Sequence, residues 1–107
     1  MSQFDDRAKG QEAKFAFDAE TKFKAEARRN KLLGIWAAEL LGHTGEAATA
    51  YAAEVVAADF EEAGDEDVFR KVSADIKAKG LSIGDDVIRQ KMLQLKLTAN
   101  EQVAAES

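Results

Sequence analysis

The chain has 107 residues, with 15 Lys and Arg against 20 Asp and Glu, and it contains neither proline nor cysteine. This length fits one small domain, and the lack of cysteine excludes disulfides, thiolate metal sites and thiol nucleophiles, as is typical of the reducing cytosol. The start lacks a basic and apolar leader, and no stretch approaches the ~18 apolar residues of a membrane span, so we expect a protein that is neither exported nor inserted into a membrane.

The first 31 residues differ from the rest of the chain in charge. They hold eight basic and six acidic side chains, whereas the remainder holds seven basic and fourteen acidic ones. An acidic body argues against nucleic-acid binding, because neutralising phosphates requires a concentrated basic face. One short basic cluster is present, made up of Lys22, Lys24, Arg28, Arg29 and Lys31. We interpret it as a solvated helix face or, as a second hypothesis, a docking patch for an anionic surface.

The N-terminal segment combines helix-forming charge pairs with an unusual number of aromatic residues. Opposite charges recur four residues apart between residues 5 and 28, and each such pair stabilises an isolated helix by roughly 0.3 kcal/mol. Four of the six phenylalanines lie within the first 23 residues, yet this apolar surface is too small to hold a long helix firmly on a bundle. We therefore predict a weakly ordered, helix-competent arm over residues 1–19 and a helical domain over residues 20–107.

Two interpretations of this arm remain open from composition. Aromatic anchors on a helix-competent segment are typical of a chain that folds onto a partner. Alternatively, the arm is the exposed start of the first helix, with its phenylalanines packed on the bundle.

Four helices are predicted after the arm, which makes the fold all-α. The first carries an apolar stripe that includes Trp36, begins at Leu32 or earlier, and ends where Gly42 is placed to cap it. The second runs from an N-cap at Thr44 to Gly64 and is apolar around most of its circumference, so we expect it to lie at the centre.

The third and fourth helices are predicted from their capping residues and from the spacing of their apolar residues. An N-cap at Asp65 starts the third, which ends at Gly80, and a capping box at Ser82 starts the fourth. The last turns of the fourth helix, residues 98–107, are polar and are expected to fray. Because the connections are short, neighbouring helices must turn back on each other, and we predict a compact four-helix bundle.

Little in the chain indicates catalysis. The one histidine, His43, is explained by contact with carbonyl groups at a helix end, and the paired carboxylates lie at polar helix ends. A calcium loop counted from Asp59 fails because Ala63 and Arg70 occupy ligand positions. A glycine-rich phosphate-binding loop is also missing. We therefore expect no enzyme, no metal site and no required cofactor.

Several stretches of the chain resemble a known family. The longest is FKAEARRNKLLGIWAAELLG at 23–42, and the shorter ones are FDDR at 4–7, EAKF at 12–15, YAAEVV at 51–56, DFEEAG at 59–64 and DVFRK at 67–71. Together they resemble the ζ subunit of the α-proteobacterial F1FO-ATP synthase, a family long catalogued as a domain of unknown function. The resemblance covers residues 4 to about 72 and is looser beyond them.

The resemblance implies an inhibitor of ATP hydrolysis. In that family the N-terminal region inserts between an α and a β subunit of F1, against γ, and blocks rotation in the hydrolytic direction. Carried over to this chain, the inhibitory segment would be residues 1–19. Its contact residues would be Phe4, Asp5, Asp6, Arg7, Glu12, Lys14, Phe15 and Phe17. The protein would then be cytoplasmic, held on the F1 sector at the inner face of the plasma membrane, and we expect it to be monomeric when free.

A second functional hypothesis is a small helical regulator that binds a nucleotide or another ligand among its helices. Members of the ζ family have been suggested to bind adenine nucleotides weakly. The missing phosphate-binding loop gives this hypothesis no support from the residues of this chain.

Overall fold

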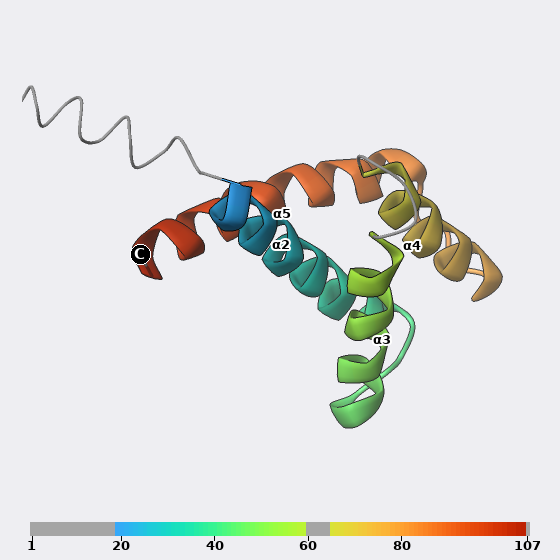
Figure 1. Ribbon diagram of the computed structural model, residues 1–107. Helices are drawn as coiled ribbons and strands as arrows, with labels where there is room; N and C mark the ends of the chain where they lie inside the picture. Colours follow the sequence, from blue (N-terminus) through green and yellow to red (C-terminus); the bar gives the residue numbers. More distant parts are fainter. Residues whose placement is uncertain (1–18, 60–64, 107) are drawn as a thin grey trace, which may run out of the picture.

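The structure is a computed structural model, and it describes residues 19–59 and 65–106. These residues form four helices and no strand: α2 (Ala19–Leu40), α3 (Gly45–Ala58), α4 (Glu66–Ala78) and α5 (Asp85–Glu106) (Figure 1). The predicted all-α, four-helix fold is confirmed. The arm predicted over residues 1–19 lies, apart from Ala19, outside the described residues.

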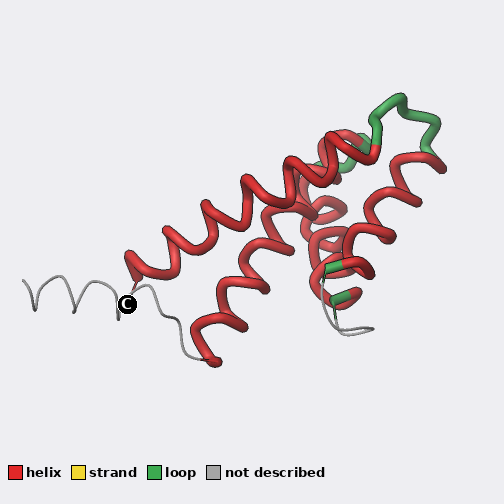
Figure 2. Tube along the Cα trace, turned by 90° about the horizontal axis from the view of Figure 1, so that it is seen from above, coloured by secondary structure: helices red, strands yellow, loops and turns green. Residues whose placement is uncertain are grey.

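Helix α2 is the central element of the fold. It contacts each of the other three helices, and α5 runs beside it in the opposite direction (Figures 1 and 2). The antiparallel arrangement is visible in the contacts of Arg28, whose guanidinium donates to Gln102 and Glu106, both at 2.9 Å. The start of α2, where the N-terminal arm joins the domain, therefore lies beside the end of α5.

The prediction that the second helix lies at the centre is wrong. One face of α3 is buried, through Tyr51, Ala52, Val55 and Ala58. The opposite face exposes four alanines, at positions 47, 50, 53 and 57. Alanine favours a helix through its propensity and adds little apolar surface, so an alanine-rich circumference does not require burial on all sides.

A glycine brings α2 and α3 together. A Cβ atom added at Gly34 would lie 2.6 Å from the Cα of Ala52 and 3.3 Å from the Cβ of Val55. A helix backbone can approach another this closely only where the side chain is absent. Gly34 thus determines where the two helices cross.

The core lies where the four helices meet. Its largest fully buried side chains are Leu33 of α2, Val55 of α3, Val68, Val72 and Ile76 of α4, and Ile88 of α5. Trp36 is only partly buried and packs against this core from α2, with the Lys91 ammonium 5.8 Å from its ring centre. Trp36, which lies on the predicted apolar stripe of this helix, thus packs at the edge of the core.

The end of α2 and the start of α3 lie where the sequence predicted them. Gly42 has a φ of 85°, and the next backbone N–H, that of His43, donates to the carbonyl of Ala38 at 2.9 Å. This left-handed conformation favours glycine because it has no Cβ. Thr44 occupies the N-cap of α3, although its side chain makes no capping hydrogen bond.

Of the last two helices, α4 starts where it was predicted and α5 starts later. Asp65 occupies the N-cap of α4, although its side chain makes no capping hydrogen bond. Helix α5 begins at Asp85, three residues after Ser82, because the carbonyl of Gly84 accepts the first hydrogen bonds and the Asp85 carboxylate accepts from Ser73 at 2.9 Å.

The C-terminal part of α5 is packed along α2. The helix continues to Glu106, and two of its last residues, Ala99 and Val103, are 0% and 1% exposed. The expectation that these turns fray is therefore wrong, because it rested on polar residues such as Glu101 and Gln102, which are exposed, while the residues beside them are buried. None of the helices in the described part of the chain is long and apolar enough to cross a membrane.

Candidate functional site

The predicted inhibitory contacts lie outside the described residues. They are Phe4, Asp5, Asp6, Arg7, Glu12, Lys14, Phe15 and Phe17, all within residues 1–18. The described structure instead shows the helix to which this segment is joined and the surface around it.

The five residues of the basic cluster do not share one exposed face. Lys22, Lys24 and Lys31 are exposed. Arg28 is engaged with the end of α5, where its guanidinium lies 2.8 Å from a carboxylate oxygen of Glu106. Arg29 is only 2% exposed. Lys24 also lies near the end of α5, with its ammonium 3.8 Å from Glu106. The two arginines connect helices within the domain, and Lys22 and Lys31 are the exposed cations that a partner could contact.

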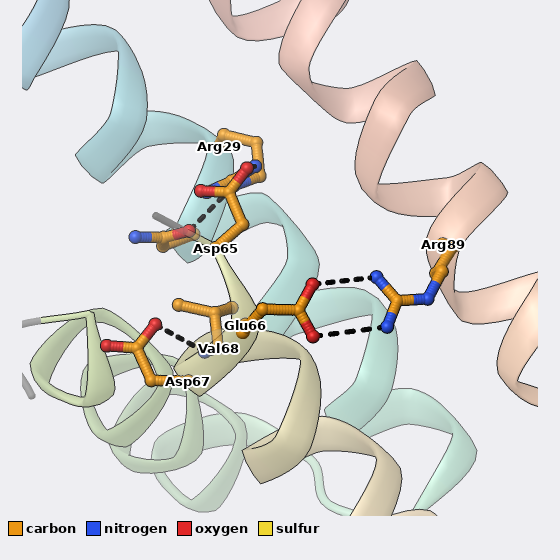
Figure 3. A network of polar contacts seen from close by, with 7 residues as sticks. Arg29, Asp65, Glu66, Asp67, Val68 and Arg89 are labelled. Carbon is orange, nitrogen blue, oxygen red and sulfur yellow. Dashed lines mark hydrogen bonds and ion pairs between the residues drawn. The ribbon is translucent and has the colours of Figure 1, made fainter. Parts of the chain in front are cut away.

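Arg29 is the centre of a network of polar side chains between α2 and the start of α4 (Figure 3). Its Nε donates to Oδ1 of Asn30 at 2.6 Å, and its Nη2 donates to Oδ1 of Asp65 at 2.8 Å. The hydrogen bond from Arg29 holds the pKa of the Asp65 carboxyl below its ordinary value, although partial burial opposes this. A buried guanidinium requires such a carboxylate, because an unpaired charge inside a protein is strongly unfavourable.

A second arginine and carboxylate pair lies beside the first and joins α4 to α5. Both Nη atoms of Arg89 donate to the Glu66 carboxylate, at 3.1 and 3.2 Å (Figure 3). The Arg89 guanidinium also stacks 3.8 Å from the ring centre of Phe69. This pair is exposed and therefore stabilises the fold only weakly.

A shallow hollow of about 230 Å³ lies between these two pairs. Its lining residues are Arg29, Asp65, Glu66, Arg89, Met92, Leu93 and Lys96. It is smaller than the pockets of roughly 300–1,000 Å³ that enclose small-molecule ligands. Both of its guanidinium groups are already paired with carboxylates, and the one remaining cation, Lys96, does not by itself make a phosphate-binding site.

The single tyrosine and the single histidine lie close together, on the α3 side of the molecule. The rings of Tyr51 and His43 are 5.8 Å apart, and the Tyr51 hydroxyl donates to Asp75 at 2.8 Å. Burial, and then the hydrogen bond to Asp75, raise the pKa of the Tyr51 hydroxyl far above its ordinary value. The Lys71 ammonium pairs with Asp75 at 2.9 Å. This arrangement stabilises the contact between α3 and α4.

The acidic residues near the start of α4 are engaged in structural contacts. Asp65 pairs with Arg29, and Oδ1 of Asp67 accepts from the backbone N–H of Val68 at 2.8 Å. Within residues 19–59 and 65–106, no group of three or more His, Asp or Glu side chains could hold a metal ion.

The inward orientation of Arg29 is the feature that the sequence interpretation missed. Ala25, Leu33 and Ala37 are buried and are separated by multiples of four residues, and Arg29 lies midway between Ala25 and Leu33 on the same stripe. A charged residue on this apolar stripe indicates a buried ion pair. Its partner, 36 residues away, could not be identified from spacing.

Comparisons with known proteins agree with this architecture. A sequence model of the family described as ATPase inhibitor subunit zeta matches residues 1–102. A structure determined by solution NMR is 53% identical and superimposes with a TM-score of 0.71, covering 80% of this chain and 98% of that chain. None of the curated proteins matches the chain.

Proposed function

The chain belongs to the ATPase inhibitor subunit zeta family, and from this we propose that it regulates F1FO-ATP synthase by inhibiting ATP hydrolysis. The match over residues 1–102 carries the proposal, because it includes both the N-terminal segment and all four described helices except the end of α5. The role is regulatory and not enzymatic.

The proposed mechanism is a steric block. Residues 1–19 enter the interface between an α and a β subunit, against γ, and become helical there. Phenylalanines fill apolar pockets, and charges four residues apart determine the register of the helix. The position of α2 supports this proposal, since it starts at Ala19 and its packing on the other helices anchors the segment that precedes it.

Deleting residues 1–14 tests this mechanism. The deletion lies outside the four described helices, so the far-UV circular dichroism and the unfolding temperature of the domain should change little. ATP hydrolysis by cognate F1 should be inhibited by the full chain and should not be inhibited by the truncated one. Full inhibition by the truncated protein would overturn the proposed role of the segment.

The hypothesis of a nucleotide-binding regulator gains no support from the hollow between Arg29 and Arg89, because both guanidinium groups are paired with carboxylates and Lys96 alone does not form a phosphate site. Titrating ATP and ADP while recording Trp36 fluorescence and amide chemical shifts checks this alternative. We expect no saturable change localised to the bundle in the micromolar range.

A further inference from the structure

The middle of α5 differs from the rest of this acidic protein in charge. Residues 87–100 include three basic residues and no acidic one, although the whole chain has a net charge of −5. Two of these cations are engaged in the domain, Arg89 with Glu66 and Lys91 with Gln94. Lys96 makes no hydrogen bond or ion pair with the described residues and influences Asp65 only through space.

Two large apolar side chains are exposed beside Lys96. Leu93 is 62% exposed and Leu97 is 58% exposed, the highest values among the large apolar residues of the described structure. They lie four residues apart, so they occupy the same face of the helix, with Lys96 next to them. Leu93 and Lys96 also line the hollow between α4 and α5. The result is a pair of apolar anchors, a cation with no hydrogen bond or ion pair to the described residues, and an adjoining recess.

These two leucines are not needed for the core of the domain. The inward face of α5 is formed by Ile88, Met92, Ala99 and Val103. Exposed leucines of this size on one short face are typical of a contact surface. Lys96 favours an acidic partner, since a cation beside apolar surface that forms no ion pair with the described residues can be neutralised by a carboxylate from outside.

We propose that Leu93, Lys96 and Leu97 form a docking surface by which the helical domain binds an acidic surface of the F1 sector that also presents apolar side chains. This inference rests on the proposed function and adds to it a second contact, separate from residues 1–19. The leucines provide affinity, and Lys96 provides orientation and a faster association. A partner carboxylate would enter the hollow beside Lys96.

The test uses the full chain and purified cognate F1. Replacing both leucines, Leu93→Gln with Leu97→Gln, should raise the Kd for F1 by about tenfold or more, as loss of two central apolar anchors does. Lys96→Glu should raise it several-fold, with an effect that diminishes as salt increases. Maximal inhibition at saturating protein should not change, because residues 1–19 are intact. Unfolding temperatures should also stay the same, since these side chains are exposed.

Ile35→Gln serves as the matched control, because Ile35 is a partly exposed apolar residue on α2, at 37%. Its Kd should equal that of the unchanged protein. Equal Kd values for the leucine pair and for the control would overturn the docking surface and leave the proposed function intact. If the unchanged protein neither binds nor inhibits F1, the proposed function fails, and the role of this surface fails with it.

Sedimentation equilibrium of the free protein tests whether a second copy of this chain, and not F1, binds to the surface of Leu93, Lys96 and Leu97. If the protein dimerises, and the leucine replacements abolish the dimer without changing the Kd for F1, the surface is an interface between two copies. That result would overturn the proposal.

Discussion

Arg29 illustrates how one buried charge connects distant parts of the chain. Its guanidinium lies inside the domain at 2% exposure and reaches Asp65, 36 residues later, at the start of α4. The Asp65 side chain is 47% exposed, so its half of the pair remains hydrated. The interaction therefore stabilises the fold mainly by preventing an unpaired charge in the interior.

We expect Asp65→Asn to lower the free energy of unfolding by about 1–2 kcal/mol at pH 7, because it leaves the buried guanidinium without a counter-charge. The pKa of Asp65 is lowered in the folded state. The stabilisation that ionised Asp65 provides is therefore complete above the ordinary carboxyl pKa. It is lost as the pH falls through the lower pKa that this carboxyl has in the folded protein. Urea unfolding at several pH values should show the two proteins converging in acid.

Glu66→Gln is the control for this measurement, since it removes an exposed pair with Arg89. Its unfolding midpoint should stay close to that of the unchanged protein. An equal loss in both variants would mean that the burial of Arg29 is not the source of the effect.

Tyr51 provides a second titration at the residue scale, and it is the only tyrosine in the chain. Burial and the hydrogen bond to Asp75 raise the pKa of its hydroxyl. Because this pKa is raised, the stabilisation from the un-ionised Tyr51 hydroxyl is complete below the ordinary tyrosine pKa near 10. It is lost as the pH rises above that value and through the raised pKa of the folded protein. Absorbance at ~295 nm should show no phenolate at about pH 10.5 in the folded protein, and a clear signal in urea. A normal titration in the folded state would contradict the hydrogen bond.

At the scale of elements, the crossing of α2 and α3 depends on the absence of one side chain. Gly34 allows α2 to approach the backbone of α3 at Ala52. The gain in helix propensity from alanine, about 1 kcal/mol, is smaller than the cost of separating two packed helices. The same helix pair includes Val55 and Leu33 of the core, so a change in this crossing disturbs the packing at the centre.

Gly34→Ala should therefore lower the free energy of unfolding by about 2 kcal/mol, measured by urea denaturation. The matched replacement is Gly84→Ala, where the added Cβ would meet only the far end of the Asp86 side chain. That side chain can turn aside, so the effect should be much smaller. A stabilised Gly34→Ala protein would show that the helices can separate without cost.

At the scale of the whole molecule, some basic side chains form contacts within the domain, whereas others remain exposed to solvent and to a partner. The arginines of the basic cluster connect α2 to α4 and α5, whereas Lys22, Lys24 and Lys31 remain exposed. Reversing the charge of Arg28 or Arg29 would therefore disturb folding as well as docking. The lysines allow a cleaner test of the hypothesis that α2 carries a docking patch.

Reversing two of these charges, Lys22→Glu with Lys31→Glu, should leave the unfolding temperature nearly unchanged and slow association with F1 several-fold at low salt. The difference should shrink above roughly 0.3 M salt, where exposed charges are screened. Stopped-flow measurement of the onset of inhibition provides the rate. A rate that is unaffected at every salt concentration would identify these lysines as a solvated helix face.

Local features of the sequence were enough to predict the all-α class, the four helices, and the caps at Gly42 and Thr44. These features depend on residues close in the chain: propensity, spacing and a left-handed glycine. The resemblance to the zeta family likewise came from contiguous stretches, and the family model confirmed it.

Only the tertiary structure showed which helix is central, that Arg29 faces inward, and that α5 stays packed as far as Val103. Each depends on contacts between residues far apart in the chain. An alanine-rich helix can be central or peripheral, and a polar helix end can be free or packed, according to what lies against it. The exposure of Leu93 and Leu97 follows the same principle: their spacing suits a core, and the packing of the other helices leaves them on the surface.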